Sequence, residues 1–374
     1  MFVETILLIS MFVAFGGMLL IGVQVSYALF GTSVIFTAVA VFSDQYFGTA
    51  TGLDFDFFGL VIKRIYALMT NWILIAGTMF IFMGHMLDKS GIAERRLTSM
   101  QELLGGVRGG MAVSVALIGT LLAASTGIIG ASVVLLAVLS LPVMVKQGYS
   151  KELAAGTVAA SGCLGIVIPP SIMLVFMADQ IGLPAGDLFM GAVFPGLILS
   201  GLYVAYILGF SFLKPSAAPL VADRKPVTLS TFVRVLLDIV PIIVLMFLVL
   251  GSIIAGIATV TEAAGVGALA AMVLAALYRR LNIPMLREAL YSTFNTMGYI
   301  FAIIVGATVF AFVVRGLGGD EIIQEALGGL PFGPTGILLL MLFVVFLLGF
   351  VLDWIEFTLI ILPPIAPIIG DMAL

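Results

Sequence analysis

The feature that most constrains this chain is a series of long apolar stretches with few charges inside them. Hydrophobic residues make up 62% of the sequence and charged residues 10%, against roughly 25% charged residues in an ordinary soluble domain. Because a soluble fold cannot hide that much apolar surface, we infer that lipid surrounds most of the chain. A secreted disulfide scaffold, a nucleic-acid-binding protein and a conventional soluble enzyme are therefore excluded.

A membrane-spanning helix needs about 20 mostly apolar residues, and eight windows approach this requirement. They are residues 5–21, 24–43, 71–87, 152–178, 187–213, 235–255, 260–278 and 291–314. The first Lys or Arg is Lys63, so the first window lacks the basic region of a secretory signal and is interpreted as a retained helix. The sequence thus predicts an all-α polytopic membrane protein.

Two further apolar stretches, residues 110–145 and 335–369, have weak or polar centres. The centre of the first is ASTGIIGAS (124–132) and that of the second is GFVLDWIEF (349–357). Each stretch could form two full spans or one re-entrant hairpin. Basic residues lie on both sides of the first stretch, and each of its arms has only about 16 residues, which is short for a span. We therefore prefer re-entrant hairpins.

The positions of Lys and Arg predict the orientation, because cytoplasmic loops carry the excess of both. In the favoured topology the N-terminus is periplasmic, and only Lys63, Arg64 and Arg315 lie outside. The first hairpin then enters the membrane from the cytoplasm and the second from the periplasm. The residues predicted to be cytoplasmic are Lys89, Arg95, Arg96, Arg108, Lys146, Lys151, Lys214, Arg224, Lys225, Arg234, Arg279, Arg280 and Arg287.

The order of these parts repeats along the chain with opposite orientation, which is typical of the inverted repeats of secondary transporters. The predicted parts are scaffold helices with an interfacial arm helix (1–109), transport elements (110–213, comprising hairpin 110–145, broken helix 152–178 and span 187–213), a cytoplasmic linker (214–234), second scaffold helices (235–334) and the second hairpin (335–374). A counterpart of 152–213, about 60 residues long, is missing by this repeat logic. The chain is therefore expected to be C-terminally truncated.

The strongest local signal is AASGCLGIVIPPS (159–171), which interrupts an otherwise regular apolar helix. Proline removes a backbone donor and disfavours helical angles in the residue before it. A simple kink needs one proline, whereas this segment has two prolines and two glycines. Carbonyls freed at membrane depth are tolerated only where protein or an ion satisfies them, and in transporters such carbonyls often bind Na⁺.

Other polar residues inside apolar stretches are weaker candidates. Ser125, Thr126 and Ser132 offer hydroxyls at the tip of the first hairpin, although small residues also serve tight helix packing. Asp353 and Glu356 at the centre of the second hairpin are functional candidates because intramembrane acids are costly.

Glu262 is interpreted as a charge at a helix N-terminus, with Thr259 or Thr261 as the cap. The single His85 is interpreted as an interfacial residue rather than a proton relay. The single Cys163 excludes a thiolate metal site.

Several of these segments resemble the large membrane subunit of the TRAP (tripartite ATP-independent periplasmic) transporters. GIATVTEAA (256–264) is similar to the family's G-x-x-T-P-T-E-A, with Val260 in place of proline. The other matching segments are GTMFIFMGHMLDKSGIAERR (77–96), GGVRGGMAVSVALIGTLLAASTG (105–127), LPVMVKQGYSKELAAGTVAASGCLGIVIPPS (141–171) and GDLFMGAVFPGL (186–197).

The resemblance implies a Na⁺-driven, elevator-type importer of organic acids in the bacterial inner membrane. A periplasmic substrate-binding protein would deliver the acid, a small TRAP membrane subunit would complete the complex, and neither a cofactor nor an enzymatic activity is expected. C4-dicarboxylates, keto acids, sugar acids and aromatic acids all fit.

By the same resemblance, two Na⁺ sites are expected. The first would use backbone carbonyls near Gly162, Gly165 and Pro170, and the second would pair Gly349–Asp353 with a C-terminal helix. Many relatives carry Gly-Ser-Ser at the first tip, where this chain has Gly127-Ile128-Ile129, so Ser125, Thr126 or Ser132 would supply the hydroxyl. The complete set of predicted site residues is Ser125, Thr126, Gly127, Ser132, Ser161, Gly162, Gly165, Ile168, Pro169, Pro170, Ser171, Gly349 and Asp353.

Three alternatives stay open. The permease of an ATP-driven importer has an E-A-A-x-x-x-G loop that Glu262-Ala263-Ala264 imitates, but Ala268 stands where the glycine belongs. A Na⁺/anion symporter of related architecture would work without a binding protein. An intramembrane enzyme would need a catalytic pair, and His85 has no evident serine partner in the sequence.

Overall fold

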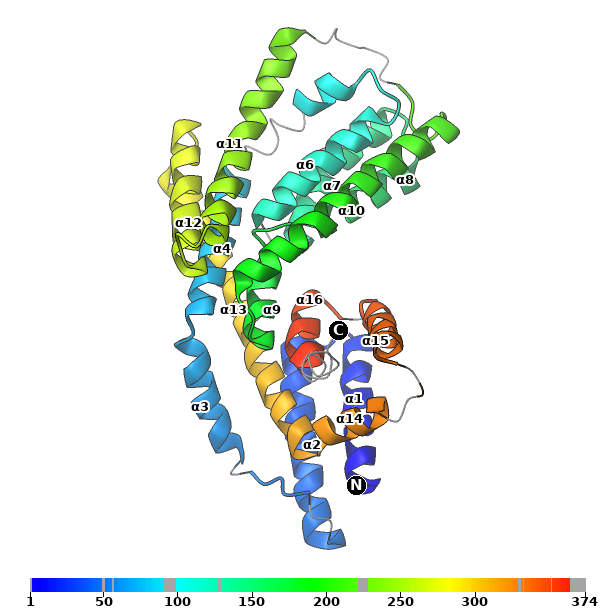
Figure 1. Cartoon of the computed structure of the whole chain (residues 1–374), viewed down its shortest axis with the longest axis vertical. Coiled ribbons are helices and arrows are strands. Elements are labelled where there is room, and N and C mark those ends of the chain that lie inside the picture. Colours follow the sequence, from blue (N-terminus) through cyan, green and yellow to red (C-terminus); the bar gives the residue numbers. More distant parts are fainter. Residues whose placement is uncertain are drawn as a thin grey trace. The chain divides into compact units, whose positions relative to one another are not determined.

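The protein is described here from a computed structural model, which contains only helices and connecting segments among its described residues. The described residues are 2–48, 51–55, 57–90, 99–126, 129–220, 228–328, 331, 333–350 and 352–363. The chain divides into two compact units, of which the first comprises residues 1–71, 180–182 and 297–374 and the second residues 72–179 and 183–296. The units are described separately, and Figure 1 shows the elements of both.

Six helices of the described residues are long and apolar enough to cross a membrane. They are α1 (Phe2–Leu20), α2 (Val25–Phe47), α10 (Ala185–Leu213), α11 (Leu229–Ile254), α12 (Val260–Leu277) and α13 (Ile283–Gly316). A seventh span is counted if α3 (Phe57–Met69) and α4 (Trp72–Lys89), which are separated by a short break, cross the membrane as one. These helices confirm the predicted all-α, polytopic membrane protein.

The first unit contains α1, α2, α3, the C-terminal part of α13, α14 (Gly319–Gly328), α15 (Pro334–Leu348), α16 (Trp354–Glu356) and a π-helical turn (Phe357–Ile361). Its core includes contacts between aromatic side chains of α1 and α13. The Phe310 ring lies 5.4 Å from that of Phe12 and 5.3 Å from that of Phe15, centroid to centroid. Gly306 lets α13 approach α2, because a Cβ there would lie 3.2 Å from the Ser26 carbonyl oxygen.

The second unit contains α4, α6 (Gly110–Thr126), α7 (Ile129–Lys146), α8 (Lys151–Cys163), most of α9 (Ile172–Ile181), α10, α11, α12 and the N-terminal part of α13. Buried apolar residues of α6, α7 and α8 form one continuous core, and these helices lie side by side in Figure 1. On another side of the unit, α12 packs closely along α4. Gly267 permits this approach, since a Cβ there would meet Met83 Sδ at 2.8 Å.

Two helices include residues outside the predicted apolar windows. Residues 57–69, which lie between two predicted windows, form the amphipathic helix α3. Helix α11 begins at Leu229, inside the predicted linker, because the Thr228 side chain caps its first turn by accepting from the Thr231 amide. The central part of that linker (221–227) and much of the predicted arm helix (91–98) lie outside the described residues.

The first hairpin region forms two helices, α6 and α7, with 17 and 18 residues. At 1.5 Å per residue each is about 26 Å long, slightly less than the hydrocarbon core of a bilayer. Tyr149, which follows α7, links that end of the helix pair to the start of α6, because its buried hydroxyl accepts hydrogen bonds from the Met111 and Ala112 amides. The re-entrant placement of both hairpins stays a prediction, and residues 364–374 of the second lie outside the described residues.

Candidate functional site

The predicted interruption of the helix at 152–178 is present. Helix α8 starts after Ser150, whose side chain accepts from the Leu153 amide, and it ends at Cys163. One 3₁₀ turn follows at Leu164–Ile166, and α9 starts only at Ile172. The chain between the two helices is stabilised by the Leu164 carbonyl, which accepts from the amides of both Val167 (3.1 Å) and Ile168 (3.0 Å).

The two prolines explain why helix does not continue through this break. Pro169 and Pro170, joined by a cis peptide bond, have no N–H group, so they cannot donate to the carbonyls of Gly165 and Ile166 four residues earlier. The Ser171 hydroxyl replaces one missing donor by bonding the Ile166 oxygen at 2.7 Å. Pro169 leaves the Gly165 carbonyl without its helical donor, which makes that oxygen available to another donor or a cation.

The break packs against the first hairpin through glycines. A Cβ at Gly162 would lie 3.1 Å from the Val133 nitrogen and 3.2 Å from its Cα on α7. A Cβ at Gly119 on α6 would lie 2.6 Å from the Ser161 Cβ and 2.9 Å from Leu136 Cδ1. Because such contacts leave no room for a side chain, α6, α7 and α8 approach closely only with glycine at these positions.

The structure brings together some of the predicted site residues. Ser132, buried in the first turn of α7, is adjacent to Val133 and therefore close to Gly162. Ser161 lies on α8, but its hydroxyl bonds the Thr157 carbonyl. Gly165, Ile168, Pro169, Pro170 and Ser171 all belong to the buried break. Ser125 and Thr126 end α6, whereas Gly127 lies outside the described residues.

Gly349 and Asp353 belong to the other compact unit, at the bend of the second hairpin. Gly349 follows the last residue of α15, and Asp353 caps α16 by accepting from the Trp354 amide at 2.8 Å. Glu356, three residues later, is only 1% exposed and accepts from the Asp353 backbone. Its Oε2 atom has no hydrogen-bond partner among the described residues.

Two features support a functional interpretation of this second bend. The π-helical turn (Phe357–Ile361) directly follows Glu356, and such turns are frequent at functional sites. Tyr299 of α13 lies close enough to Glu356 and Asp353 to interact with both electrostatically. A buried carboxylate with an oxygen left unpaired is unfavourable, so this position is suited to a proton or a cation.

Comparison with known proteins places these elements in a family. The family model described as "Tripartite ATP-independent periplasmic transporter, DctM component" matches residues 12–374. The chain belongs to the DctM family. The resemblance drawn from the sequence motifs is thereby confirmed.

Three similar proteins illustrate the range of this family. The chain is 26% identical to YgiK of Salmonella typhimurium over 96% of its own length and 80% of that protein's length. It is 28% identical to the isethionate TRAP transporter permease protein DctMQ of Oleidesulfovibrio alaskensis, over 94% of the chain and 53% of the relative. It is 30% identical to the C4-dicarboxylate TRAP transporter large permease protein DctM of Rhodobacter capsulatus, over 72% and 62%. The chain thus spans between about half and four fifths of these relatives.

In this DctM-family chain, Glu262 has a local structural role. The Thr259 side chain accepts from the Glu262 amide, and Glu262 Oε2 accepts from the Thr259 amide at 2.8 Å, which forms a capping box at the start of α12. Thr261 instead bonds the Trp72 carbonyl at 3.4 Å. The interpretation as a helix N-terminal charge is confirmed, and Thr259 is the cap.

His85 also has local partners. Its Nε2 atom lies 3.3 Å from the Thr296 hydroxyl, and Lys89, one turn later, pairs with Glu288 at 2.6 Å. Both contacts join α4 to α13 within the second unit. Sequence reasoning missed these pairs because their members are about 200 residues apart.

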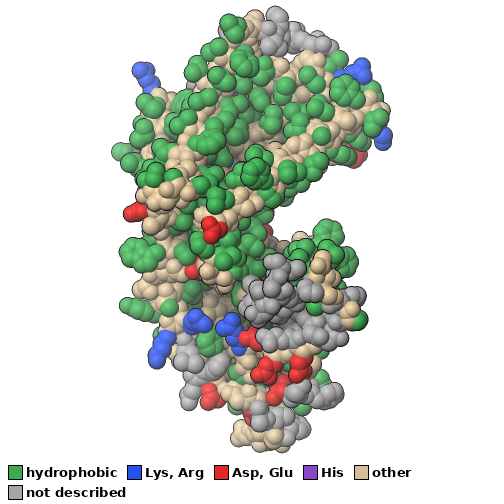
Figure 2. Space-filling view, viewed as in Figure 1, with side chains coloured by type: hydrophobic (Ala, Val, Ile, Leu, Met, Phe, Trp, Pro, Cys, Tyr) green, Lys and Arg blue, Asp and Glu red, His purple; other side chains and the backbone are tan. Residues whose placement is uncertain are grey.

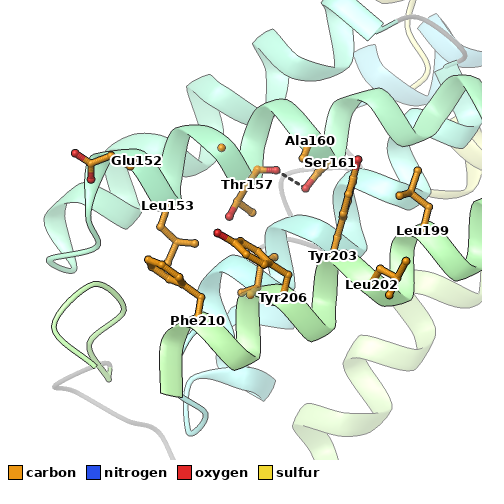
Figure 3. Close-up of a pocket in the computed structure, with 12 residues that line it drawn as sticks. Glu152, Leu153, Thr157, Ala160, Ser161, Leu199, Leu202, Tyr203, Tyr206 and Phe210 are labelled. Atoms are coloured by element: carbon orange, nitrogen blue, oxygen red, sulfur yellow. Dashed lines mark hydrogen bonds between the residues drawn. The ribbon is translucent and has the colours of Figure 1, made fainter. Parts of the chain in front are cut away.

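A cavity of about 650 Å³ between α8 and α10 was also missed. Leu199, Leu202, Tyr203, Tyr206 and Phe210 of α10 form much of its lining, and Figure 3 shows them facing α8. None of its lining residues is Lys, Arg or His, and Glu152 stands at one end. An organic anion would find no positive charge in this lining, so the cavity is unsuited to the acid substrates considered from the sequence.

Proposed function

We propose that this chain is the large membrane subunit of a Na⁺-coupled, binding-protein-dependent importer of small organic acids in a bacterial inner membrane. The observation that carries the proposal is the broken helix α8–α9, whose Gly165 carbonyl loses its helical donor beside the first hairpin. Broken helices of this kind bind coupling ions and substrates in secondary transporters. The chain's place in the DctM family supports the same activity.

The chemistry of the two helix ends divides the break into a cation side and an anion side. The C-terminal end of α8 presents carbonyl oxygens and carries a partial negative charge, which favours Na⁺. The N-terminal end of α9 at Ile172 presents amide groups and a partial positive charge, which favours a carboxylate or sulfonate. We propose that Na⁺ binds near Gly162, Gly165 and Pro170, and that the acid binds towards α9.

The relatives suggest the substrate class. Two of them are named for isethionate and for C4-dicarboxylates, which are both small organic anions. For this chain we propose a small organic anion delivered by a periplasmic binding protein, with a small membrane subunit completing the tripartite complex that the family description names. We further propose elevator-type movement, in which the hairpin and broken helix carry the substrate across the membrane together.

Reconstitution of the complete transporter in liposomes tests this proposal. Uptake of a radiolabelled acid should require an inward Na⁺ gradient and the loaded binding protein, and it should not respond to internal ATP. Stimulation by ATP would favour an ATP-driven importer, and full uptake without the binding protein would favour an independent symporter. Gly165→Val should abolish Na⁺-dependent uptake because a branched side chain obstructs close approach of an ion to the backbone.

A further inference from the structure

The cavity between α8 and α10 has no role in the function proposed above. Along α8 it extends from Glu152 to Ser161, nine residues, or about 14 Å of helix. Its volume of about 650 Å³ falls in the range of pockets that hold one small organic molecule, roughly 300–1,000 Å³. It is open on the side of Leu202 and Tyr206, whose side chains are 59% and 65% exposed.

The long walls of this cavity are apolar. Leu153, Gly156 and Ala160 contribute from α8, and the leucine and aromatic side chains of α10 lie opposite. Both helices belong to a polytopic membrane protein, and α10 is itself long and apolar enough to span. An unbranched hydrocarbon chain matches this surface, whereas a charged solute does not.

The charged groups of the cavity gather at one end, where α8 begins and α10 ends. Glu152 lines this end and has no ion-pair partner among the described residues. Lys214 lies over the ring of Phe210, another lining residue, with Nζ 5.4 Å from the ring centroid. Figure 2 shows basic side chains at this end, next to a face covered by hydrophobic side chains. Glu152 and the basic side chains at this end, which include Lys214 and Lys151 at the start of α8, lie beside an apolar slot. Charges of both signs there are complementary to a zwitterionic headgroup on an acyl chain.

The Thr157 hydroxyl lies at the depth expected for the ester groups of a phospholipid. Thr157 is five residues beyond Glu152, which places it about 7.5 Å further along α8. The headgroup region of one bilayer leaflet is about 5–8 Å thick, so Thr157 lies where ester groups meet acyl chains. Its side chain points towards Tyr206 in Figure 3. Its hydroxyl is buried and has no hydrogen-bond partner among the described residues, so an ester carbonyl would supply the acceptor it lacks.

We propose that this cavity binds one phospholipid with an ethanolamine headgroup. One acyl chain lies between α8 and α10, the phosphate faces Lys214, and the primary ammonium donates to Glu152. A choline headgroup carries no N–H donor, and a glycerol headgroup carries no cation, so both bind less tightly. At the inner end, Tyr203 lines the cavity and also packs on Leu164 and Ile168 of the break. The bound lipid therefore supports the broken helix from the side.

Native mass spectrometry of the purified, delipidated full chain tests the proposal, with phosphatidylethanolamine, phosphatidylcholine and phosphatidylglycerol added in turn. We expect one tightly retained phosphatidylethanolamine per chain. Gly156→Leu should displace it, because a Cβ at Gly156 meets no atom within 4 Å and the leucine side chain fills the cavity. Displacing two methylene groups of the lipid weakens its binding about tenfold.

Gly201→Leu is the matched control. Gly201 lies on α10, a Cβ there also meets no atom within 4 Å, and the residue does not line the cavity. Both changes favour helix over glycine, and circular dichroism verifies that both variants are folded. Equal lipid retention by the two variants would overturn the proposal.

Glu152→Gln tests the headgroup separately. It should remove the preference for ethanolamine over choline while some acyl-chain binding persists. Retention of the preference would overturn the assignment of Glu152. Cys163 is exposed and lies close to the lining residue Tyr203. Cross-linking of Cys163 to a protein helix in native membranes would show that protein covers this side of the cavity, and would likewise overturn the proposal.

Discussion

The first hairpin meets the broken helix through glycines and neutral side chains, whereas the second hairpin places Asp353 and Glu356 at its bend. At the first, polar atoms become available because Pro169 and Pro170 remove backbone donors. At the second, the polar atoms are carboxylate oxygens, one of them buried without a partner. A cation at the first would meet carbonyl dipoles, and at the second it would meet formal charge. The two regions should therefore differ in their tolerance of added volume and of lost charge.

The largest difference is expected when volume is added. Gly162→Ala puts a methyl group where the α7 backbone already lies 3.1–3.2 Å from the Cβ position. We expect a loss of about 1–3 kcal/mol or more in unfolding free energy and loss of uptake. Thermal unfolding in detergent and uptake in proteoliposomes measure the two effects.

Gly349→Ala is the matched change at the second hairpin. Its Cβ would lie 3.4 Å from the Phe346 oxygen, an ordinary contact, and its φ is −62°. This variant should unfold at nearly the wild-type temperature, which thermal unfolding in detergent measures. Equal damage by the two substitutions would contradict the distinction between a closely packed first hairpin and a more open second bend.

The next effect concerns the hydroxyl that stabilises the break. Ser171→Ala removes the hydroxyl that donates to the Ile166 carbonyl, and Pro170 has no N–H group that could replace it. We expect the free energy of unfolding to fall by about 1–3 kcal/mol. Ser140→Ala on α7 is the control. Ser140 is equally buried and bonds the Leu136 carbonyl, which also has a backbone donor within the helix. If the two variants unfold at the same temperature, the proposed role of Ser171 fails.

A smaller effect follows from removal of charge at the second bend. Glu356→Gln keeps the shape of the side chain but removes its charge. We expect the Na⁺ concentration at half-maximal uptake to rise about tenfold, which corresponds to about 1.4 kcal/mol of binding free energy. Glu262→Gln is the same substitution in the first turn of another helix, but on an exposed side chain. A Na⁺ titration of uptake should shift for Glu356 only. Parallel shifts would mean that burial does not distinguish the two acids.

The smallest effect is expected at the exposed cap itself. Thr259→Ala should reduce stability by about 1 kcal/mol through loss of the α12 cap. Transport per folded molecule should be unchanged, because Glu262 and Thr259 serve the helix end rather than substrate binding. A large loss of uptake by well-folded protein would reopen a coupling role for the Glu262-Ala263-Ala264 segment.

The main features of the fold follow from local sequence. Apolar stretches of spanning length predicted α1, α2 and α10 to α13, because the bilayer fixes helix length. The helix break at 164–171 followed from proline chemistry alone. Helix α3 was not predicted, because it is amphipathic, carries Lys63 and Arg64, and has only 13 residues. It is therefore shorter and more polar than the apolar windows used to predict spans.

The candidate site was predictable in position but not in its hydrogen bonding. Gly162 to Ser171 could be singled out by residue type, yet sequence could not tell which oxygens are already satisfied. Ser161 and Ser171 were predicted as site residues, and the structure adds that their hydroxyls donate to the carbonyls of Thr157 and Ile166. Such partners depend on side-chain rotamers and on the path of the backbone after the break, which residue types do not specify.

The sequence by itself determined the membrane class, the helix break and the family motifs, because hydropathy and proline sterics act over a few neighbouring residues. Only the tertiary structure decided which groups from distant segments meet. It placed Gly119 against Ser161, buried Glu356 with an oxygen unpaired, and left the cavity between α8 and α10 beside Thr157. The physical reason is that packing and hydrogen-bond satisfaction depend on distances between elements far apart in the chain.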